Sequence, residues 1–144
     1  MLKRLTSCLL MAGAVMAISA HADEVWSTNI GEVVYEADLP NGMAVLSYPT
    51  DSDTRGRAFI AELAGEFTGR TGYEGVWIEA DGAAGLCDVA IAAPDTGEQS
   101  HNWGRVRVIF VDPDFPSTFV ALRGDCFDDP SEMLVARPIT AFDE

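Results

Sequence analysis

"EVVYEADLPNGMAVLSY", residues 32–48, is the stretch of the chain that decides the fold. Every second residue from Val33 to Leu39 is apolar and carboxylates dominate the opposite face, which is the pattern of a half-buried strand. The apolar face consists of Val33, Tyr35, Ala37 and Leu39. Pro40-Asn41-Gly42 is typical of a turn, and residues 43–48 return as a second apolar run. The stretch therefore predicts a β-hairpin.

Runs of similar length recur along the rest of the chain, separated by glycines and by an Asp-Pro turn. One run, residues 105–111, puts Val106, Val108 and Phe110 on a single face. The expected strands are residues 32–39, 43–48, 74–79, 86–92, 105–111, 118–123 and 133–137. We therefore expect an all-β domain of seven to eight short antiparallel strands, either a small sandwich or a small barrel.

Residues 57–67, "RAFIAELAGEF", fit two patterns. Their apolar residues fall on one face of a helix, and Ala, Glu and Leu are good helix formers. They also fit strand alternation, through Phe59, Ala61 and Leu63. Because Gly56 precedes the segment and another glycine interrupts it, barely two helical turns remain, so we expect a strand. The alternative is an α+β domain with one helix near residues 57–67.

The first 22 residues have the composition of a signal peptide. Lys3 and Arg4 give a positive start, an apolar run follows, and Ala20-His21-Ala22 is typical of a cleavage site. The run is shorter than the roughly 20 residues needed to span a bilayer. We expect residues 1–22 to be cleaved and residues 23–144 to form one exported domain, periplasmic or secreted, with no membrane insertion after cleavage. The alternative is an uncleaved membrane anchor.

The chain is strongly acidic, with 23 Asp and Glu against 9 Lys and Arg and a net charge of −14. Its single lysine, Lys3, leaves with the export segment. Phosphate binding depends on cationic side chains, so this charge excludes nucleic acid and anionic lipid surfaces as partners. A cationic protein would instead be attracted, although acidity can also serve solubility alone. Nothing in the sequence indicates the oligomeric state.

Two cysteines lie in the expected mature domain, Cys87 and Cys126. An exported domain meets an oxidising environment, in which such a pair forms a disulfide. Closing a loop of this length stabilises a domain by about 4 kcal/mol in the chain-entropy model. The alternative, a reactive thiol pair, lacks a C-x-x-C spacing and the basic flank that would lower a thiol pKa.

Catalytic and metal-binding patterns are weak. Residues 51–62 match a calcium loop at several positions, but Arg55 stands where an oxygen ligand is needed. His101 is the single histidine beyond residue 22, so a zinc site of the common kind cannot be assembled. We expect no metal, no cofactor and no catalytic residue. Carboxylate pairs are too numerous for the sequence to exclude a carboxylate-dependent hydrolase.

The stretch "GYEGVWIEADG", residues 72–82, suggests a binding surface. If Val76 and Ile78 face the core of a strand, Trp77 and Tyr73 point outward, where aromatic side chains commonly dominate recognition. Arg105 and Arg107 share the outward face of their strand, just after Trp103. The expected binding residues are Tyr73, Trp77, Trp103, Arg105 and Arg107.

A second arrangement fits the same residues. A shift of register by one position would turn Trp77 into the core. Arg105 and Arg107 would then be ordinary partners of carboxylates on neighbouring strands.

The stretch "TGRTGYEGVWIEADG", residues 68–82, is similar to the tyrosine and tryptophan stretch of the periplasmic C-type lysozyme inhibitors. That family consists of small β-barrels with a disulfide. The resemblance covers about 15 residues and lacks the lysine of the family's stretch, so no site residue is carried over from it.

Together these patterns favour a non-catalytic exported domain that binds a partner. An inhibitor or binder of a cationic, envelope-directed protein is one concrete version, indicated by the net charge. The alternatives are a carboxylate-dependent hydrolase and a structural component of the envelope.

Overall fold

The computed structural model describes residues 24–65, 72–82 and 85–139, and the expected export segment, residues 1–22, lies outside them. The described chain forms ten strands and no helix. The strands are β1 (Val25–Thr28), β2 (Gly31–Asp38), β3 (Ala44–Tyr48), β4 (Gly56–Ile60), β5 (Gly72–Ile78), β6 (Ile91–Ala92), β7 (Gln99–Ser100), β8 (Trp103–Phe110), β9 (Phe119–Arg123) and β10 (Glu132–Pro138). Among these residues there is accordingly no helix long and apolar enough to cross a membrane.

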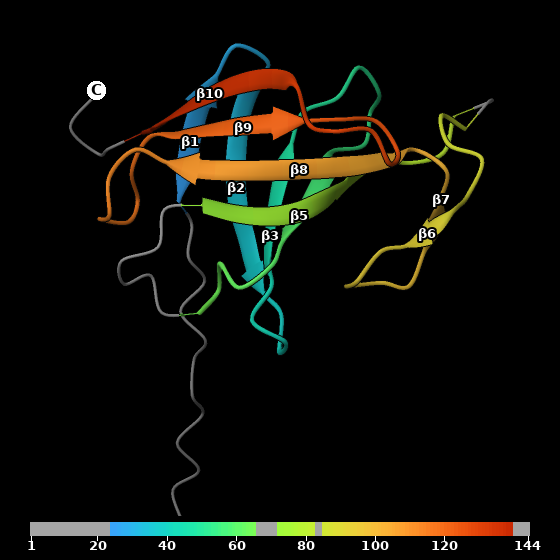
Figure 1. Cartoon of the computed structure of the whole chain (residues 1–144), viewed down its shortest axis with the longest axis horizontal. Helices are drawn as coiled ribbons and strands as arrows, with labels where there is room; N and C mark the ends of the chain where they lie inside the picture. The colour runs from blue at the N-terminus through green and yellow to red at the C-terminus, as the bar shows by residue number, and fades with distance from the viewer. Residues whose placement is uncertain (1–23, 66–71, 83–84, 140–144) are drawn as a thin grey trace, which may run out of the picture.

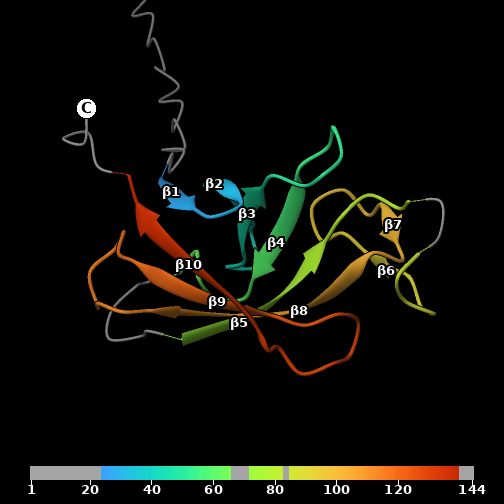
Figure 2. The same cartoon turned by 90° about the horizontal axis from the view of Figure 1, so that it is seen from above.

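Eight of the strands close into an antiparallel barrel. Around the barrel the order is β1-β2-β3-β4-β5-β8-β9-β10, and β10 pairs with β1 to complete the ring. Figures 1 and 2 show β5, β8, β9 and β10 as one wall, β1 to β4 as the opposite wall, and the two-stranded β6–β7 sheet to one side. The prediction of an all-β domain is confirmed, and of the two expected architectures the barrel is the one formed.

The predicted hairpin of residues 32–48 is formed by β2 and β3. Its register shifts between Tyr35, which pairs with Leu46, and Ala37, which pairs with Val45. Such a bulge inserts one extra residue and so reverses the facing of the residues beyond it. Tyr35 therefore points into the barrel, whereas Ala37 packs against a hydrophobic cluster outside it. The expectation that both share one face is wrong for this reason.

Most other predicted strands agree with the structure to within two residues at each end. The segments 74–79, 105–111, 118–123 and 133–137 correspond to β5, β8, β9 and β10. The segment 86–92 is different, because only Ile91 and Ala92 belong to a strand. Leu86 and Cys87 instead form bends, held by hydrogen bonds from their N–H groups to the Asn102 side chain and to the carbonyl of His101.

The ambiguous segment 57–67 begins as a strand. β4 runs to Ile60, and the chain then turns through residues 61–65, with Glu62 in the left-handed region at φ 61°. The expectation of a strand is correct as far as Ile60, and the described part of the segment contains no helix. Residues 66 and 67 lie outside the described chain.

The residues that the structure describes form two hydrophobic cores, one inside the barrel and one against its outer wall. The inner core receives side chains from all eight barrel strands, among them Trp26, Leu46, Val108 and Phe119. The outer core lies against β3, β4, β5 and β8 and consists of Val45, Phe59, Ile78, Cys87, Ala93 and Trp103. This stretch of wall is therefore buried on both faces, which is unusual for an antiparallel sheet.

An ion pair and a disulfide are among the contacts that fasten the β6–β7 sheet and the segment before it to the barrel. Arg57 on β4 forms an ion pair with Asp95 at 2.6 Å, in the turn between β6 and β7. The predicted disulfide between Cys87 and Cys126 is present and joins the segment before β6 to the loop between β9 and β10. It links two loops that lie at the same end of the barrel (Figure 1).

Candidate ligand-binding site at the open end of the barrel

Aromatic side chains fill one end of the barrel, which we call the aromatic end. Phe119 packs edge-to-face against Trp26 and Phe110, with ring centroids 5.4 Å apart in both pairs. Phe115, from the loop after β8, contacts the same group of rings. The indole N–H of Trp26 donates a hydrogen bond to the carbonyl of Ser117, which ties that loop over the end. The aromatic end is therefore occupied by protein side chains.

The other end of the lumen contains a cavity of 180 Å³. Its wall is mostly apolar and includes Val33, Leu46, Ala58, Trp77, Val106 and Ala121. Eight-stranded barrels have an interior that side chains can just fill, or that can hold one small ligand. Here the small side chains of Ala58 and Ala121 leave that space empty. We call this end the open end.

Four residues lie together beside the cavity and form what we call the mouth: Tyr48, Trp77, Glu79 and Arg123. Tyr48, Trp77 and Arg123 line the cavity itself, and Glu79 contacts Tyr48 and Arg123. The guanidinium carbon of Arg123 lies 3.5 Å from the centre of the Trp77 ring and 5.8 Å from that of Tyr48. Arg123 Nη1 is 3.0 Å from Glu79 Oε1, which also accepts a 3.0 Å hydrogen bond from the Tyr48 hydroxyl. The mouth is thus a connected set of one cation, one carboxylate and two aromatic rings.

Tyr48 acts as a hydrogen-bond donor in this set. Burial raises the pKa of the Tyr48 hydroxyl above its ordinary value, and the charge of Glu79 raises that pKa further, while Arg123 opposes both. The phenol therefore stays protonated at neutral pH and can donate to Glu79. Tyr48 packs so closely over Gly56 that a Cβ at position 56 would overlap its ring. The glycine thus allows the ring to lie flat at the mouth.

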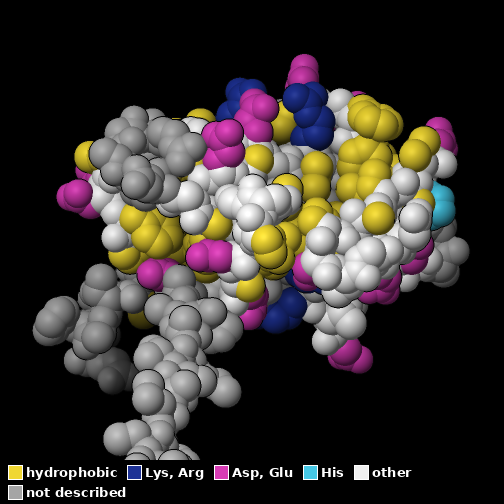
Figure 3. Space-filling view, turned by 90° about the horizontal axis from the view of Figure 1, so that it is seen from below, with side chains coloured by type: hydrophobic (Ala, Val, Ile, Leu, Met, Phe, Trp, Pro, Cys, Tyr) yellow, Lys and Arg dark blue, Asp and Glu magenta, His cyan; other side chains and the backbone are white. Residues whose placement is uncertain are grey.

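A wider pocket of 430 Å³, which we call the vestibule, lies outside the mouth. It shares Tyr48, Arg123, Ile30 and Glu132 with the cavity, so the two adjoin each other at these residues. Its charged residues are Asp51, Glu79, Glu132 and Arg123, which gives three carboxylates and one cation. The vestibule therefore carries a net negative charge. Figure 3 shows one face of the molecule, on which acidic side chains are distributed both at the edge and between hydrophobic side chains.

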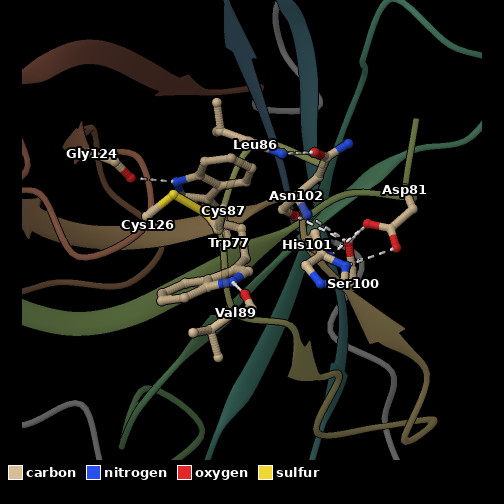
Figure 4. The surroundings of a disulfide bond; sticks show 11 residues. Trp77, Asp81, Leu86, Cys87, Val89, Ser100, His101, Asn102, Gly124 and Cys126 are labelled. Atoms are coloured by element: carbon tan, nitrogen blue, oxygen red, sulfur yellow. Dashed lines mark hydrogen bonds and ion pairs between the residues drawn. A yellow bond between two sulfur atoms is a disulfide. The ribbon is translucent and has the colours of Figure 1, made fainter. Parts of the chain in front are cut away.

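The disulfide supports the loops around the open end (Figure 4). The Trp77 indole N–H donates a 2.9 Å hydrogen bond to the carbonyl of Gly124, two residues before Cys126. Cys126 N–H in turn bonds to the carbonyl of Trp103. The loop that carries the disulfide is therefore connected directly to the aromatic ring under Arg123.

Asp81 holds the loop of residues 100–102, whose His101 carbonyl accepts a hydrogen bond from the N–H of Cys87. Its carboxylate accepts hydrogen bonds from the backbone N–H of His101 and the hydroxyl of Ser100 (Figure 4). These bonds lower the pKa of Asp81 below its ordinary value, with the backbone bond from His101 as the larger cause. His101 is thus a loop residue whose Nδ1 lies 3.6 Å from Oδ2 of Asp81.

The structure corrects the orientation expected for the aromatic residues. Trp77 and Tyr73 point into the lumen and are 2% and 4% exposed, and Trp103 is buried in the outer core. The outward assignment is wrong because Val76 and Ile78 on the opposite face are covered as well, by the outer core. Trp77 nevertheless lines the cavity, so it belongs to the candidate site as a buried wall residue and not as an exposed one.

Arg105 and Arg107 do face outward, as expected. Each is paired, Arg105 with Asp129 at 3.2 Å and Arg107 with Glu74 at 2.6 Å. The pair with Glu74, on the neighbouring strand β5, is the one that the alternative arrangement expects, whereas Asp129 lies in the loop between β9 and β10. Neither residue lines the cavity or the vestibule, so the structure does not bring the five predicted binding residues together.

Sequence reasoning missed Arg123, Glu79 and Tyr48 as site residues. A signal was present in β9, where Phe119, Ala121 and Arg123 alternate and so share a face. Arg123 thus ends a strand whose other inward residues are apolar, which is the pattern of a charged side chain at the rim of a barrel. Of the residues in the calcium-like stretch, Asp51 lines the vestibule. The described residues contain no group of three or more His, Cys, Asp or Glu side chains placed to hold a metal ion.

No family model matches the chain, and no curated protein or solved structure matches it. Function is therefore inferred from the site itself.

Proposed function

We propose that this protein is a non-catalytic binding protein that takes the apolar group of a small molecule into its barrel. The observation that carries the proposal is the cavity lined by Ala58, Ala121 and Trp77, which adjoins the vestibule at Tyr48 and Arg123. Binding sites of this kind are concave and mostly apolar, with a few polar groups that fix orientation. At the mouth those polar groups are Arg123 and Glu79, together with the hydroxyl of Tyr48.

The size of the cavity limits the part of a ligand that can enter it. An engineered apolar cavity of about 150 Å³ is known to bind benzene, and the present cavity measures 180 Å³. We therefore expect one phenyl ring or a short branched alkyl group inside the lumen. The rest of the ligand would lie in the vestibule.

The test is binding of benzene-sized probes, followed as a rise in melting temperature on addition of toluene or phenol. A ligand that binds only the folded protein raises stability in proportion to the logarithm of its concentration over Kd. Ala121→Leu should fill the cavity and abolish the rise. Ala92→Leu adds the same atoms at an exposed position of β6 and should leave the rise unchanged. A rise that persists in Ala121→Leu, or none in the wild type, would contradict the proposal.

Export to the periplasm or the medium is part of the same proposal. The disulfide between Cys87 and Cys126 supports it, because structural disulfides persist in oxidising compartments. The expected cleavage after residue 22 can be checked by mass spectrometry of the native protein.

A cationic protein is the second candidate partner. The net charge of −14 and the carboxylates Asp51 and Glu132 at the open end favour it. Mixing the protein with a basic hydrolase such as lysozyme should then give an association that weakens as salt is added. Absence of binding at low salt would remove this candidate and would leave the small-molecule proposal intact.

A further inference from the structure

The mouth of the barrel stabilises a cation. The guanidinium carbon of Arg123 lies 3.5 Å from the centre of the Trp77 ring, and the charge of Arg123 is neutralised by Glu79 at 3.0 Å. The side chains of Arg123 and Glu79 are only 31% and 25% exposed, so both are partly withdrawn from water. Aromatic faces attract cations most strongly where water is partly excluded. The combination of two rings and a carboxylate is therefore suited to positive charge, and here the protein supplies that charge itself.

Negative charge remains in the vestibule after this pairing. Glu132 is the cross-strand neighbour of Arg123, and its side chain is exposed. Asp51 lies across the vestibule, in the loop after β3. Within the described chain, neither Glu132 nor Asp51 forms an ion pair. A second cation that entered the vestibule would thus meet two carboxylates without a charged partner.

A ligand anion would meet the opposite conditions. The one cation of the vestibule, Arg123, is already paired with Glu79. An anion could use Arg123 only by competing with that carboxylate, beside Glu132 and in the field of a chain with net charge −14.

We infer that the ligand is a small organic cation, an aryl or alkyl amine whose apolar group fills the cavity and whose ammonium group lies in the vestibule beside Glu132 and Asp51. This inference rests on the proposed function and adds the charge of the ligand to it. The apolar group is selected by Ala58, Ala121 and Trp77, which line the cavity. The ammonium group is selected by carboxylates that Arg123 leaves unpaired.

Three probes that share a phenyl group test the inference: 2-phenylethylamine, 2-phenylethanol and 3-phenylpropanoate. At neutral pH they carry positive, zero and negative charge, so their affinities by titration calorimetry separate charge from apolar burial. We expect the amine to bind at least about threefold more tightly than the alcohol at low salt, a factor typical of an exposed ion pair, and the acid to bind most weakly. The preference for the amine should shrink as salt is added.

Glu132→Gln should reduce the affinity for 2-phenylethylamine to nearly that for 2-phenylethanol, without changing the latter. Asp114→Asn is the matched control, because it removes one exposed carboxylate from the loop after β8, at the aromatic end. It should leave both affinities unchanged. The melting temperature of each variant without ligand shows that the fold is retained.

Equal affinities for amine and alcohol, or a preference for the acid, would overturn this inference while the proposed function stood. If Glu132→Gln weakened binding of both 2-phenylethylamine and 2-phenylethanol, the inference would also be overturned. Glu132 would then maintain the structure of the site and would not recognise the charge of the ligand. If none of the three probes binds, and toluene and phenol fail as well, the proposed function itself is wrong.

Discussion

The guanidinium carbon of Arg123 lies 3.5 Å from the centre of the Trp77 ring, directly above a side chain that forms the wall of the cavity. Arg123 ends β9, and Trp77 lies one residue before the end of β5. The contact therefore joins two strands that do not pair with each other, because β8 lies between them. The Trp77 indole also bonds to the carbonyl of Gly124, the residue after Arg123. The open end is therefore held by one aromatic ring that contacts two consecutive residues of the chain.

Replacing Arg123 by methionine should lower the free energy of unfolding by about 1–2 kcal/mol. Methionine keeps an unbranched apolar chain over Trp77 but removes the cation–π attraction and leaves Glu79 without its ion pair. In urea titrations, Arg123→Met and Glu79→Gln should together cost less than the sum of their separate effects, with a coupling of about 1 kcal/mol. Strict additivity would show that the ion pair contributes nothing.

Gly104→Ala should destabilise the barrel by about 3 kcal/mol. Gly104 pairs with Trp77 across β5 and β8, and a Cβ there would collide with the carbonyl of Gly124 and with the indole. The substitution therefore combines overpacking with loss of a buried hydrogen bond, each of which costs about 1–3 kcal/mol.

Gly72→Ala is the control for this substitution. It lies in the same strand as Trp77, and a Cβ at position 72 would meet no atom within 4 Å. We expect its midpoint of urea unfolding to equal or slightly exceed that of the wild type. A similar loss of unfolding free energy in both variants would indicate that these glycines are needed for their backbone conformation and not to avoid overlap with neighbouring atoms.

The strands themselves were predictable because their alternation is local. In β8, Val106, Val108 and Phe110 face the lumen as the sequence indicates, since Arg107 and Ile109 on the opposite face are exposed. β5 could not be assigned in the same way. Trp77 faces the lumen and Ile78 faces the outer core, so both faces are buried and alternation does not tell the inside from the outside.

The site depends on relations that no local pattern contains. The cavity exists because Ala58 on β4 and Ala121 on β9 face the same space, and only closure of the barrel brings these strands together around it. The outer core requires the β6–β7 sheet to fold back against the wall, held in part by the disulfide. The cysteine pair was predictable from composition, whereas the loops that it joins at the mouth were not.

Removal of the disulfide by Cys87→Ser with Cys126→Ser should lower the free energy of unfolding by about 4 kcal/mol, the chain-entropy value for a loop of this size. The two cysteines are 39 residues apart in sequence and join the segment before β6 to the loop between β9 and β10. Because this loss acts through the unfolded chain, the slowest-exchanging amides of the barrel should accelerate with the fall in global stability. Residues 85–102 and 124–131 should also open locally, with free energies well below the global value, and exchange in these residues that still tracks global unfolding would contradict a local role for the bond.

Stability should fall as pH rises above about 10, the ordinary pKa of tyrosine. Burial raises the pKa of Tyr48 in the folded protein, and it also raises that of Tyr35, where the hydrogen bond to Asp38 adds to the effect. A raised folded pKa means that the unfolded chain releases its proton first, so the contribution is complete below pH 10 and is lost above it. Each such tyrosine adds a slope of at most about 1.4 kcal/mol per pH unit. Urea titrations between pH 8 and 11 should therefore show a shallower decline in Tyr48→Phe than in the wild type, and a decline of unchanged slope would mean that the phenol at the mouth titrates freely in the folded protein.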